Sequence, residues 1–442
     1  MKKLKEQTSR YFFMTHLRFC LKTAAWTVLI TCLSPDYANA QQIKFTSHAI
    51  AVETIDPAAE NYDDLIPLMK KIGSATVVAL GEGTHDNGAA LLAKARMVKF
   101  LHEKMGFDVL LFEYAFLGSL KANKYLSLDS SIYSATRSLN GWLSKELYPG
   151  LYEYIRATHK TGRPLFVGGF DHEKVPRGVP DYLEMLEEVY QKIRFNEADK
   201  IYIDSLVRTN GALGNRYQES FTANGRRKAE QLIDSLRTAV MVSNKFTGEE
   251  RDLKLMYLKH LLMMSEERSS GEFKNIVRDY HMAERYFWIH KNLFAGKKVI
   301  LWAATAHLVH DMVLIDRDEK VNNEKFRPYY QMGDYLNARL GKNYYVIGFT
   351  SYAGERGQIF PRESPHNKAS YNVQVTPAPH ESFEAYMSRS KYRYAFVDLE
   401  SVLPDVDARF TALPLGNRMD FAPWAKILDA LFYVGPSQPV KH

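Results

Sequence analysis

Side chains able to transfer protons follow several short apolar runs of this sequence. The run Thr76–Leu80 leads directly into Gly-Glu-Gly-Thr-His, which places Glu82 and His85 in one loop. A histidine with a pKa near neutrality can take a proton from water, and a neighbouring carboxylate fixes the tautomer of the ring and stabilises its charged form. This loop is therefore a candidate for general acid/base chemistry.

Further candidates follow other apolar runs. In chain order they are Glu113, Asp171, His172 and His307. On the stretch after His85, Lys94 and Arg96 could direct a cation at the loop or could form a solvated face. Each of these residues, taken singly, could instead cap a helix or form a structural ion pair, because such pairs produce the same pattern.

Several common catalytic motifs are missing. The sequence has no Gly-x-Ser-x-Gly elbow for a nucleophilic serine, no His-Glu-x-x-His helix for zinc and no P-loop. The pair Gly81-x-Gly83 lacks the third glycine of a dinucleotide fingerprint, since Asp86 stands there. We therefore expect neither a metal nor another cofactor.

The elements that must position these side chains are indicated by short β-branched runs that alternate with helical stretches. Strands are predicted at Thr76–Leu80, Val109–Phe112, Leu165–Val167, Val299–Trp302, Tyr344–Phe349, Ala395–Val397 and Ala430–Val434. Apolar residues at helical spacing from Leu91 to Met105, followed by Gly106, predict a helix after the first strand. The pattern is typical of an α/β fold with a mostly parallel or mixed sheet flanked by helices. In such sheets ligands bind beyond the carboxyl ends of the strands, so we expect the candidates to share one rim.

The N-terminal 40 residues resemble a secretory signal peptide. Basic residues precede an apolar run from Ala24 to Leu33, and Ala38-Asn39-Ala40 supplies the small residues of a cleavage site. The run is short of the roughly 20 residues that a membrane span needs, which makes an uncleaved anchor the weaker alternative. A faint lipoprotein box ends at Cys32. We expect a periplasmic or secreted protein, without stable membrane insertion after cleavage.

The rest of the chain, 41–442, is predicted to be one domain. Within it, 181–293 is rich in charged amphipathic stretches and is either a helical insertion or lid, or further helices packed on the sheet. Residues 1–40 hold both cysteines, six Lys/Arg and two Asp/Glu, which leaves 52 basic and 49 acidic residues and no cysteine beyond them. No block of five like charges occurs, so nucleic acid is not an expected partner.

At the level of motifs, Leu80-Gly-Glu-Gly-Thr-His85, Lys94-x-Arg96 and Phe112-Glu113 resemble the opening signature of the erythromycin esterase family. Further segments agree in order from about 75 to 434, namely Gly169-Phe170-Asp171, Arg278-Asp279, Trp302-Ala303 with His307, Met332-Gly333 and Ile347-Gly348-Phe349-Thr350. The resemblance implies hydrolysis of a small-molecule ester or lactone, such as a macrolide antibiotic, by water and without a covalent intermediate.

The resemblance also assigns roles. The general-base histidine of the family falls on His85, its motif glutamate on Glu82, the glutamate after the second strand on Glu113, a basic residue on Lys94 and a later histidine on His307. Glu82 or Glu113 would then orient His85. His307, with Lys94 or Arg96, would stabilise the oxyanion, and Asp171 and His172 would contact substrate.

The sequence departs from the family pattern at four positions. Ala304 and Thr305 stand where the later motif has His and Asn, and Asp86 and Ala89 replace Gly and Glu in the earlier one. The missing histidine leaves two alternatives open. One is a hydrolase or transferase acting on cell-surface polysaccharide or an acylated sugar. The other is a non-catalytic ligand- or metal-binding protein of the same fold.

Overall fold

The protein is described by a computed structural model, which covers residues 44–128, 148–172, 179–212, 223–270, 274–316, 330–357 and 373–439, except 404 and 417. The predicted signal peptide, residues 1–40, lies outside the described residues.

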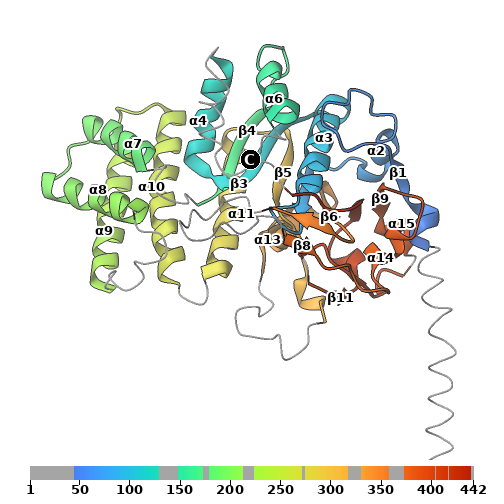
Figure 1. The fold of residues 1–442 in the computed structure, drawn as a ribbon. Helices are drawn as coiled ribbons and strands as arrows, with labels where there is room; N and C mark the ends of the chain where they lie inside the picture. The colour runs from blue at the N-terminus through green and yellow to red at the C-terminus, as the bar shows by residue number, and fades with distance from the viewer. Residues whose placement is uncertain are drawn as a thin grey trace, which may run out of the picture.

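In the described part of the chain, eight strands form one sheet in the order β1-β9-β12-β6-β2-β5-β3-β4 (Figure 1). They are β1 (Ile50–Val52), β2 (Val77–Glu82), β3 (Phe107–Ala115), β4 (Phe166–Asp171), β5 (Lys298–Ala304), β6 (Tyr344–Thr350), β9 (Tyr394–Asp398) and β12 (Ala430–Val434). Neighbours from β12 through β4 pair in parallel, whereas β9 is antiparallel to both β1 and β12. The predicted class, α/β with a mostly parallel sheet flanked by helices, is confirmed.

Each predicted strand is present, and the sequence pattern missed β1. Two short antiparallel strand pairs were also missed, one of β7 (Gly354–Arg356) with β8 (Val373–Val375) and one of β10 (Phe410–Ala412) with β11 (Asp420–Ala422). At three residues each, these strands are too short to show the alternation on which such a prediction depends.

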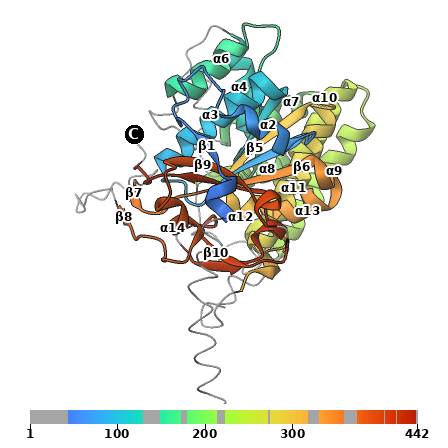
Figure 2. The same ribbon diagram turned by 90° about the vertical axis from the view of Figure 1, so that its right-hand side faces the viewer.

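Helices cover both faces of the sheet. They are α2 (Ile66–Ile72), α3 (Gly88–Met105), α4 (Phe116–Ser127), α6 (Glu153–Thr158), α7 (Val179–Lys192), α8 (Glu197–Ala212), α9 (Ala223–Val242), α10 (Gly248–Ser269), α11 (Lys274–Asn292), α12 (Thr305–Leu308), α13 (Met332–Leu340), α14 (Phe383–Ser388) and α15 (Leu399–Val402). Successive side chains of a strand point to opposite faces, so β2 sends Val77 and Ala79 into one apolar cluster and Val78 and Leu80 into the other. In Figure 2, α2 and α3 lie on one side of the strands, and α11 and α13 lie on the other.

The helix after β2 ends at Met105, just before Gly106, as the sequence predicts, and begins at Gly88, three positions before Leu91. The side chain of Asn87 accepts a hydrogen bond from the backbone N–H of Ala90 at 3.3 Å, which caps the N-terminus of α3. Gly106 ends the helix with φ of 78°, in the left-handed region that favours glycine. This long helix carries Lys94 and Arg96 past the end of β2.

The helices α7 to α11 occupy the region predicted as a helical insertion or lid. Figure 1 shows α7 to α10, in green and yellow, beyond the β4 side of the sheet. Buried residues of all five helices belong to the same apolar cluster as Val77 and Ala79 of β2. They therefore share a core with the sheet, and their movement as a lid stays a prediction. No helix within the described residues has the length and apolar character required to cross a bilayer.

Candidate active site

Strand order brings the candidate residues to one edge of the sheet. Strand β5 lies between β2 and β3, and Glu82 at the end of β2 pairs in register with Ala304 at the end of β5. On the other side of β5, Phe112 pairs with Trp302, so that Glu113 follows immediately. The backbone N–H of Ala304 donates to Oε2 of Glu113 at 2.9 Å. Two carboxylates therefore flank the carboxyl end of one central strand.

Glu82, His85 and Lys94 form the first polar group. Oε1 of Glu82 lies 2.9 Å from Nδ1 of His85, and Oε2 accepts a hydrogen bond from Nζ of Lys94. Burial alone raises the pKa of Glu82, but the charge of Lys94 and the hydrogen bond with His85 outweigh it, so the pKa is lowered. Glu82 is thus a buried carboxylate that stays ionised.

Lys94 is fully buried beneath Glu82. Burial lowers its pKa to about 8, against the opposing influence of the Glu82 carboxylate. Its ammonium also lies 4.3 Å from the ring centroid of Trp302, a cation–π arrangement. Lys94 therefore contacts Glu82 from the buried side of this group, and its side chain is not exposed to solvent.

The side chain of His85 is 41% exposed, whereas that of Glu82 is buried. Since Nδ1 faces Glu82, Nε2 is the ring nitrogen that can exchange a proton with water or substrate. A histidine oriented by a carboxylate in this way has the geometry of a general base.

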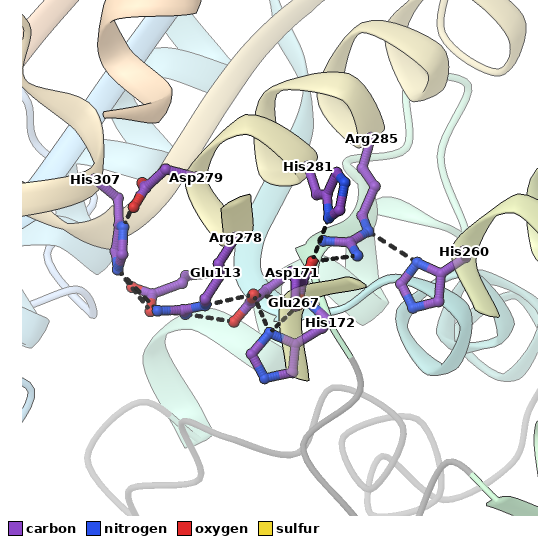
Figure 3. A network of polar contacts seen from close by, with 10 residues as sticks. All are labelled: Glu113, Asp171, His172, His260, Glu267, Arg278, Asp279, His281, Arg285 and His307. Atoms are coloured by element: carbon purple, nitrogen blue, oxygen red, sulfur yellow. Dashed lines mark hydrogen bonds and ion pairs between the residues drawn. The ribbon is translucent and has the colours of Figure 1, made fainter. Parts of the chain in front are cut away.

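Glu113, Arg278 and Asp171 form the second group (Figure 3). Nη2 of Arg278 donates to Oε1 of Glu113 at 2.8 Å and to Oδ2 of Asp171 at 2.6 Å, and its Nε donates to Oδ1 of Asp171 at 2.9 Å. Burial raises the pKa of both carboxyl groups, yet the pKa of each stays well below its usual value because the nearby cations outweigh burial. This group holds two buried carboxylates around one guanidinium.

His307 joins the second group from the short helix α12. Its Nδ1 lies 2.7 Å from Oδ1 of Asp279, and its Nε2 lies 3.5 Å from Oε1 of Glu113 and 3.2 Å from Nη1 of Arg278. Burial lowers the pKa of His307, but Asp279 and Glu113 outweigh it and raise the pKa to about 10. The ring is therefore a cation that donates toward Glu113. On losing its Nε2 proton, the ring can accept a hydrogen bond from Arg278 instead.

The two groups influence each other across the end of β5. The charge of His85 contributes to the lowered pKa of Glu113, and the charge of Glu113 acts on Lys94. The two groups are therefore close enough for their charges to interact.

Most of the predicted site residues come together. Those in or beside the two groups are Glu82, His85, Lys94, Glu113, Asp171 and His307, while His172 lies behind Asp171, with 3.0 Å between Nδ1 and Oδ1. Asp171 is fully buried and held by Arg278, which favours a positioning role over the expected contact with substrate.

Arg96 does not join them, contrary to expectation. Its guanidinium forms a two-pronged ion pair with Asp64 and donates to the backbone oxygens of Thr54 and Asn61. Residues two positions apart on a helix point to different faces, so the helix that directs Lys94 toward Glu82 directs Arg96 away from it.

Arg278 and Asp279 are the main residues that the prediction missed. Both come from α11, far along the chain from the other members. Their one signal was the Arg278-Asp279 segment of the family resemblance, since by spacing alone the pair is an ordinary charged stretch of helix. No group of three or more His, Cys, Asp or Glu within the described ranges could hold a metal ion.

The fold and these side chains define an α/β protein whose acid/base residues gather at the carboxyl ends of the central parallel strands. The family model described as Erythromycin esterase matches residues 102–419. Because this range is more than half of the chain, the protein belongs to the erythromycin esterase family. The matched range begins after the loop that carries Glu82 and His85.

Two curated relatives align over most of the chain. YbfO of Bacillus subtilis (strain 168), a hydrolase by name, is 27% identical over 84% of this chain and 86% of its own. Erythromycin esterase type II of Escherichia coli is 24% identical over 86% of this chain and 93% of its own. Family and relatives together point to a hydrolase with a small-molecule substrate.

Solved structures share the fold. A Bacillus cereus protein has a TM-score of 0.72 at 19% identity, covering 91% of this chain and 98% of its own. A mutant of the erythromycin esterase EreC in its open conformation has a TM-score of 0.66 at 18% identity, covering 88% of this chain and 97% of its own. At this identity the likeness concerns the fold alone.

Proposed function

We propose that the protein hydrolyses an ester or lactone with a water molecule that His85 deprotonates. The observation that carries this proposal is the contact of 2.9 Å between Nδ1 of His85 and the buried, ionised Glu82. With Nδ1 facing Glu82, Nε2 acts as the base, and Glu82 stabilises the imidazolium that forms.

The reaction proceeds by direct attack. The water oxygen bonds to the acyl carbon while its proton passes to Nε2 of His85, and the carbonyl oxygen becomes an oxyanion. The cationic His307, close to Arg278, stabilises this charge. The bond between the acyl carbon and the alkoxy oxygen then breaks, and the leaving oxygen takes the proton from Nε2 of His85. An alcohol and a carboxylic acid result, and the acid loses its proton to solvent.

Glu82 and Glu113 have separate roles in this proposal. Glu82 orients His85, whereas Glu113 keeps His307 and Arg278 in place beside the reacting carbonyl. Lys94 neutralises Glu82 from beneath, and Arg278 takes the part that the sequence suggested for Lys94 or Arg96.

The test uses the purified protein with erythromycin, simple lactones and acylated sugars, followed by mass spectrometry for the gain of one water. We expect His85→Ala to lower turnover by about 10²–10⁴-fold, which is the usual contribution of a general base. The exposed His48 provides the matched control, and His48→Ala should keep full activity. Turnover that survives His85→Ala, or near-stoichiometric metal bound through His85 and His307, would refute this mechanism.

A second candidate keeps the reaction and changes the substrate to an acylated sugar or cell-surface polysaccharide. The observation in its favour is Ala304, which pairs in register with Glu82 and whose backbone N–H donates to Glu113, at the position where the family pattern has a histidine. Hydrolysis of acylated sugars, without hydrolysis of erythromycin, would select it.

We further propose that residues 1–40 are a cleaved signal peptide and that the protein is periplasmic or secreted. The basic start, the short apolar run and Ala38-Asn39-Ala40 support this proposal. N-terminal sequencing of the protein from separated cell fractions should find Gln41 as the first residue.

A further inference from the structure

A chain of buried charges continues past Asp171, away from the reacting side of the candidate site (Figure 3). Nδ1 of His172 lies 3.0 Å from Oδ1 of Asp171 and 3.1 Å from Oε2 of Glu267. Oε1 of Glu267 accepts a hydrogen bond from Nη2 of Arg285 at 2.9 Å and lies 3.0 Å from Nδ1 of His281. Glu267 is therefore a buried carboxylate on α10 that receives contacts from three cationic or imidazole side chains.

Helix α11 organises this chain of charges. Arg278, His281 and Arg285 are spaced at i, i+3 and i+7, so they lie along one face of the helix. Arg278 at one end contacts the candidate site, and Arg285 at the other contacts Glu267 and, through Nε, His260 at 2.8 Å. One rigid element thus connects Glu267 with Glu113.

The charges alternate in sign along the path. From the site outward they are Glu113, Arg278, Asp171, His172, Glu267 and Arg285. Burial lowers the pKa of His172, but its two carboxylate neighbours outweigh this effect and raise the pKa, which favours the charged form of the ring. Each carboxylate of the path lies beside an arginine or beside His172.

Alternation makes the geometry of each member depend on the next. In a buried array of this kind, loss of one charge leaves its neighbours without compensation, and they must move or change protonation state. Asp171 fixes the guanidinium of Arg278 through two hydrogen bonds, and the position of Asp171 depends in turn on the contacts with His172.

We infer that Glu267 and His172 are positioning residues, which act through Asp171 on Arg278 and so hold Glu113 and His307 in place. This role requires no contact between either residue and the substrate. The inference rests on the proposed function for its effect on turnover, but its effect on Arg278 is independent of any substrate.

Two readouts test the inference in the full-length protein. The first is hydrogen exchange of the Arg278 Nε–H, followed by NMR, which we expect Glu267→Gln to accelerate at least tenfold as the bond to Asp171 loosens. The second is hydrolysis of the best ester found above, for which kcat should fall about tenfold while KM changes less than twofold. Glu267→Asp, which keeps the charge, should recover part of the slow Arg278 exchange and part of kcat.

Glu284→Gln is the matched control. Glu284 also joins α11 to α10, through Lys259 at 2.6 Å, but within the described residues its carboxylate forms no ion pair with a member of the path. This variant should leave both readouts unchanged. Glu267→Gln also removes the carboxylate partner of Arg285 and could prevent folding. His172→Gln therefore tests the same contact from its other partner, because the side chain of His172 is 17% exposed.

If Glu267 acts through His172, the double variant should be no slower than the worse of the single variants. Additive losses of kcat would overturn the inference, and so would unchanged Arg278 exchange in both single variants. A protein without hydrolase activity, but with faster Arg278 exchange in both variants, would refute the proposed function and support the positioning role.

Discussion

At the scale of single residues, Glu82 and Glu113 remain ionised in a buried site for different reasons. Glu82 depends on Lys94, an ammonium with a lowered pKa, whereas Glu113 contacts the guanidinium of Arg278 and the cationic ring of His307. Arginine stays protonated at every accessible pH, and lysine at this site does not. The first group should therefore be the more sensitive to alkali.

Lys94→Met tests this difference. The substitution leaves Glu82 as a buried charge without its ammonium, so we expect stability to fall by about 3 kcal/mol and kcat to fall at least tenfold. In the unmodified protein, activity should decline as pH rises through about 8, where Lys94 loses its proton, and this decline should be missing in Lys94→Met. Urea unfolding and the pH profile of kcat measure the two effects.

Lys99→Met is the control for Lys94. Lys99 is also buried on α3, but it donates to the backbone oxygen of Pro57 and not to a carboxylate. If Lys99→Met also lost the decline of kcat at alkaline pH, the assignment of that decline to Lys94 would be contradicted.

The pKa of His307 should depend on Asp279. The imidazolium stabilises the fold below the unfolded-state pKa near 6.5, and this contribution disappears as pH rises through about 10. By NMR, the ring should stay protonated between about pH 6 and pH 9, whereas in Asp279→Asn it should titrate within that range. Asp311→Asn, which removes the carboxylate beside the neighbouring His310, should leave His307 unchanged.

At the scale of elements, the site depends on how closely β2, β5 and α12 pack. A Cβ atom on Gly81 would lie 2.7 Å from Oγ1 and 2.8 Å from Cα of Thr305, the first residue of α12. The glycine before Glu82 therefore permits close packing of α12, which carries His307, against β2. It adopts no unusual φ angle.

Gly81→Ala should consequently disturb both stability and activity. We expect the unfolding free energy to fall by about 1–3 kcal/mol, as for other overpacked sites, and turnover to fall because His307 moves with α12. Gly162→Ala is the control, since a Cβ atom there meets nothing within 4 Å. Thermal unfolding of the two variants side by side measures the difference, and equal stability would contradict the packing argument.

At the scale of the whole molecule, Glu384 links the C-terminal part of the chain to the sheet. On α14, its Oε1 accepts hydrogen bonds from Thr350, the last residue of β6, at 2.7 Å and from the backbone N–H of Leu413 at 2.8 Å. The next residue, Pro414, lies against Gly83 together with Gly416. The carboxyl group thus supports the segment that covers the loop of Glu82 and His85.

Glu384 should make the stability of the fold depend on pH. Burial raises its pKa from 4.5 to about 7, so the folded protein binds the proton more tightly than the unfolded chain does. Its contribution is fully present below about pH 4.5 and is lost as pH rises through 7, amounting to about 3 kcal/mol. In Glu384→Gln, which keeps the oxygen acceptor, this part of the pH dependence of urea unfolding should disappear.

Glu381→Gln is the control for that measurement, because Glu381 is exposed one residue before the Ser382 that caps α14. The same loss of pH dependence in this variant would show that the effect belongs to surface charge and not to the buried carboxyl group.

The sequence by itself determined the local parts of this protein. Strand and helix types followed from apolar periodicity, and Glu82 and His85 could be paired because they lie only three positions apart in the sequence. These features depend on backbone geometry over a few residues, which the order of side chains specifies directly.

Tertiary structure alone decided which distant charges meet. Arg278 contacts Glu113 across 165 positions of the chain, and Asp279 contacts His307 from the same helix. Strand order set those distances, because β5 enters between β2 and β3 although it follows both by about two hundred residues. Such an insertion results from the packing of whole elements, so no short-range pattern records it. The same packing buried Glu267 behind the site, where its residue type and spacing carried no signal.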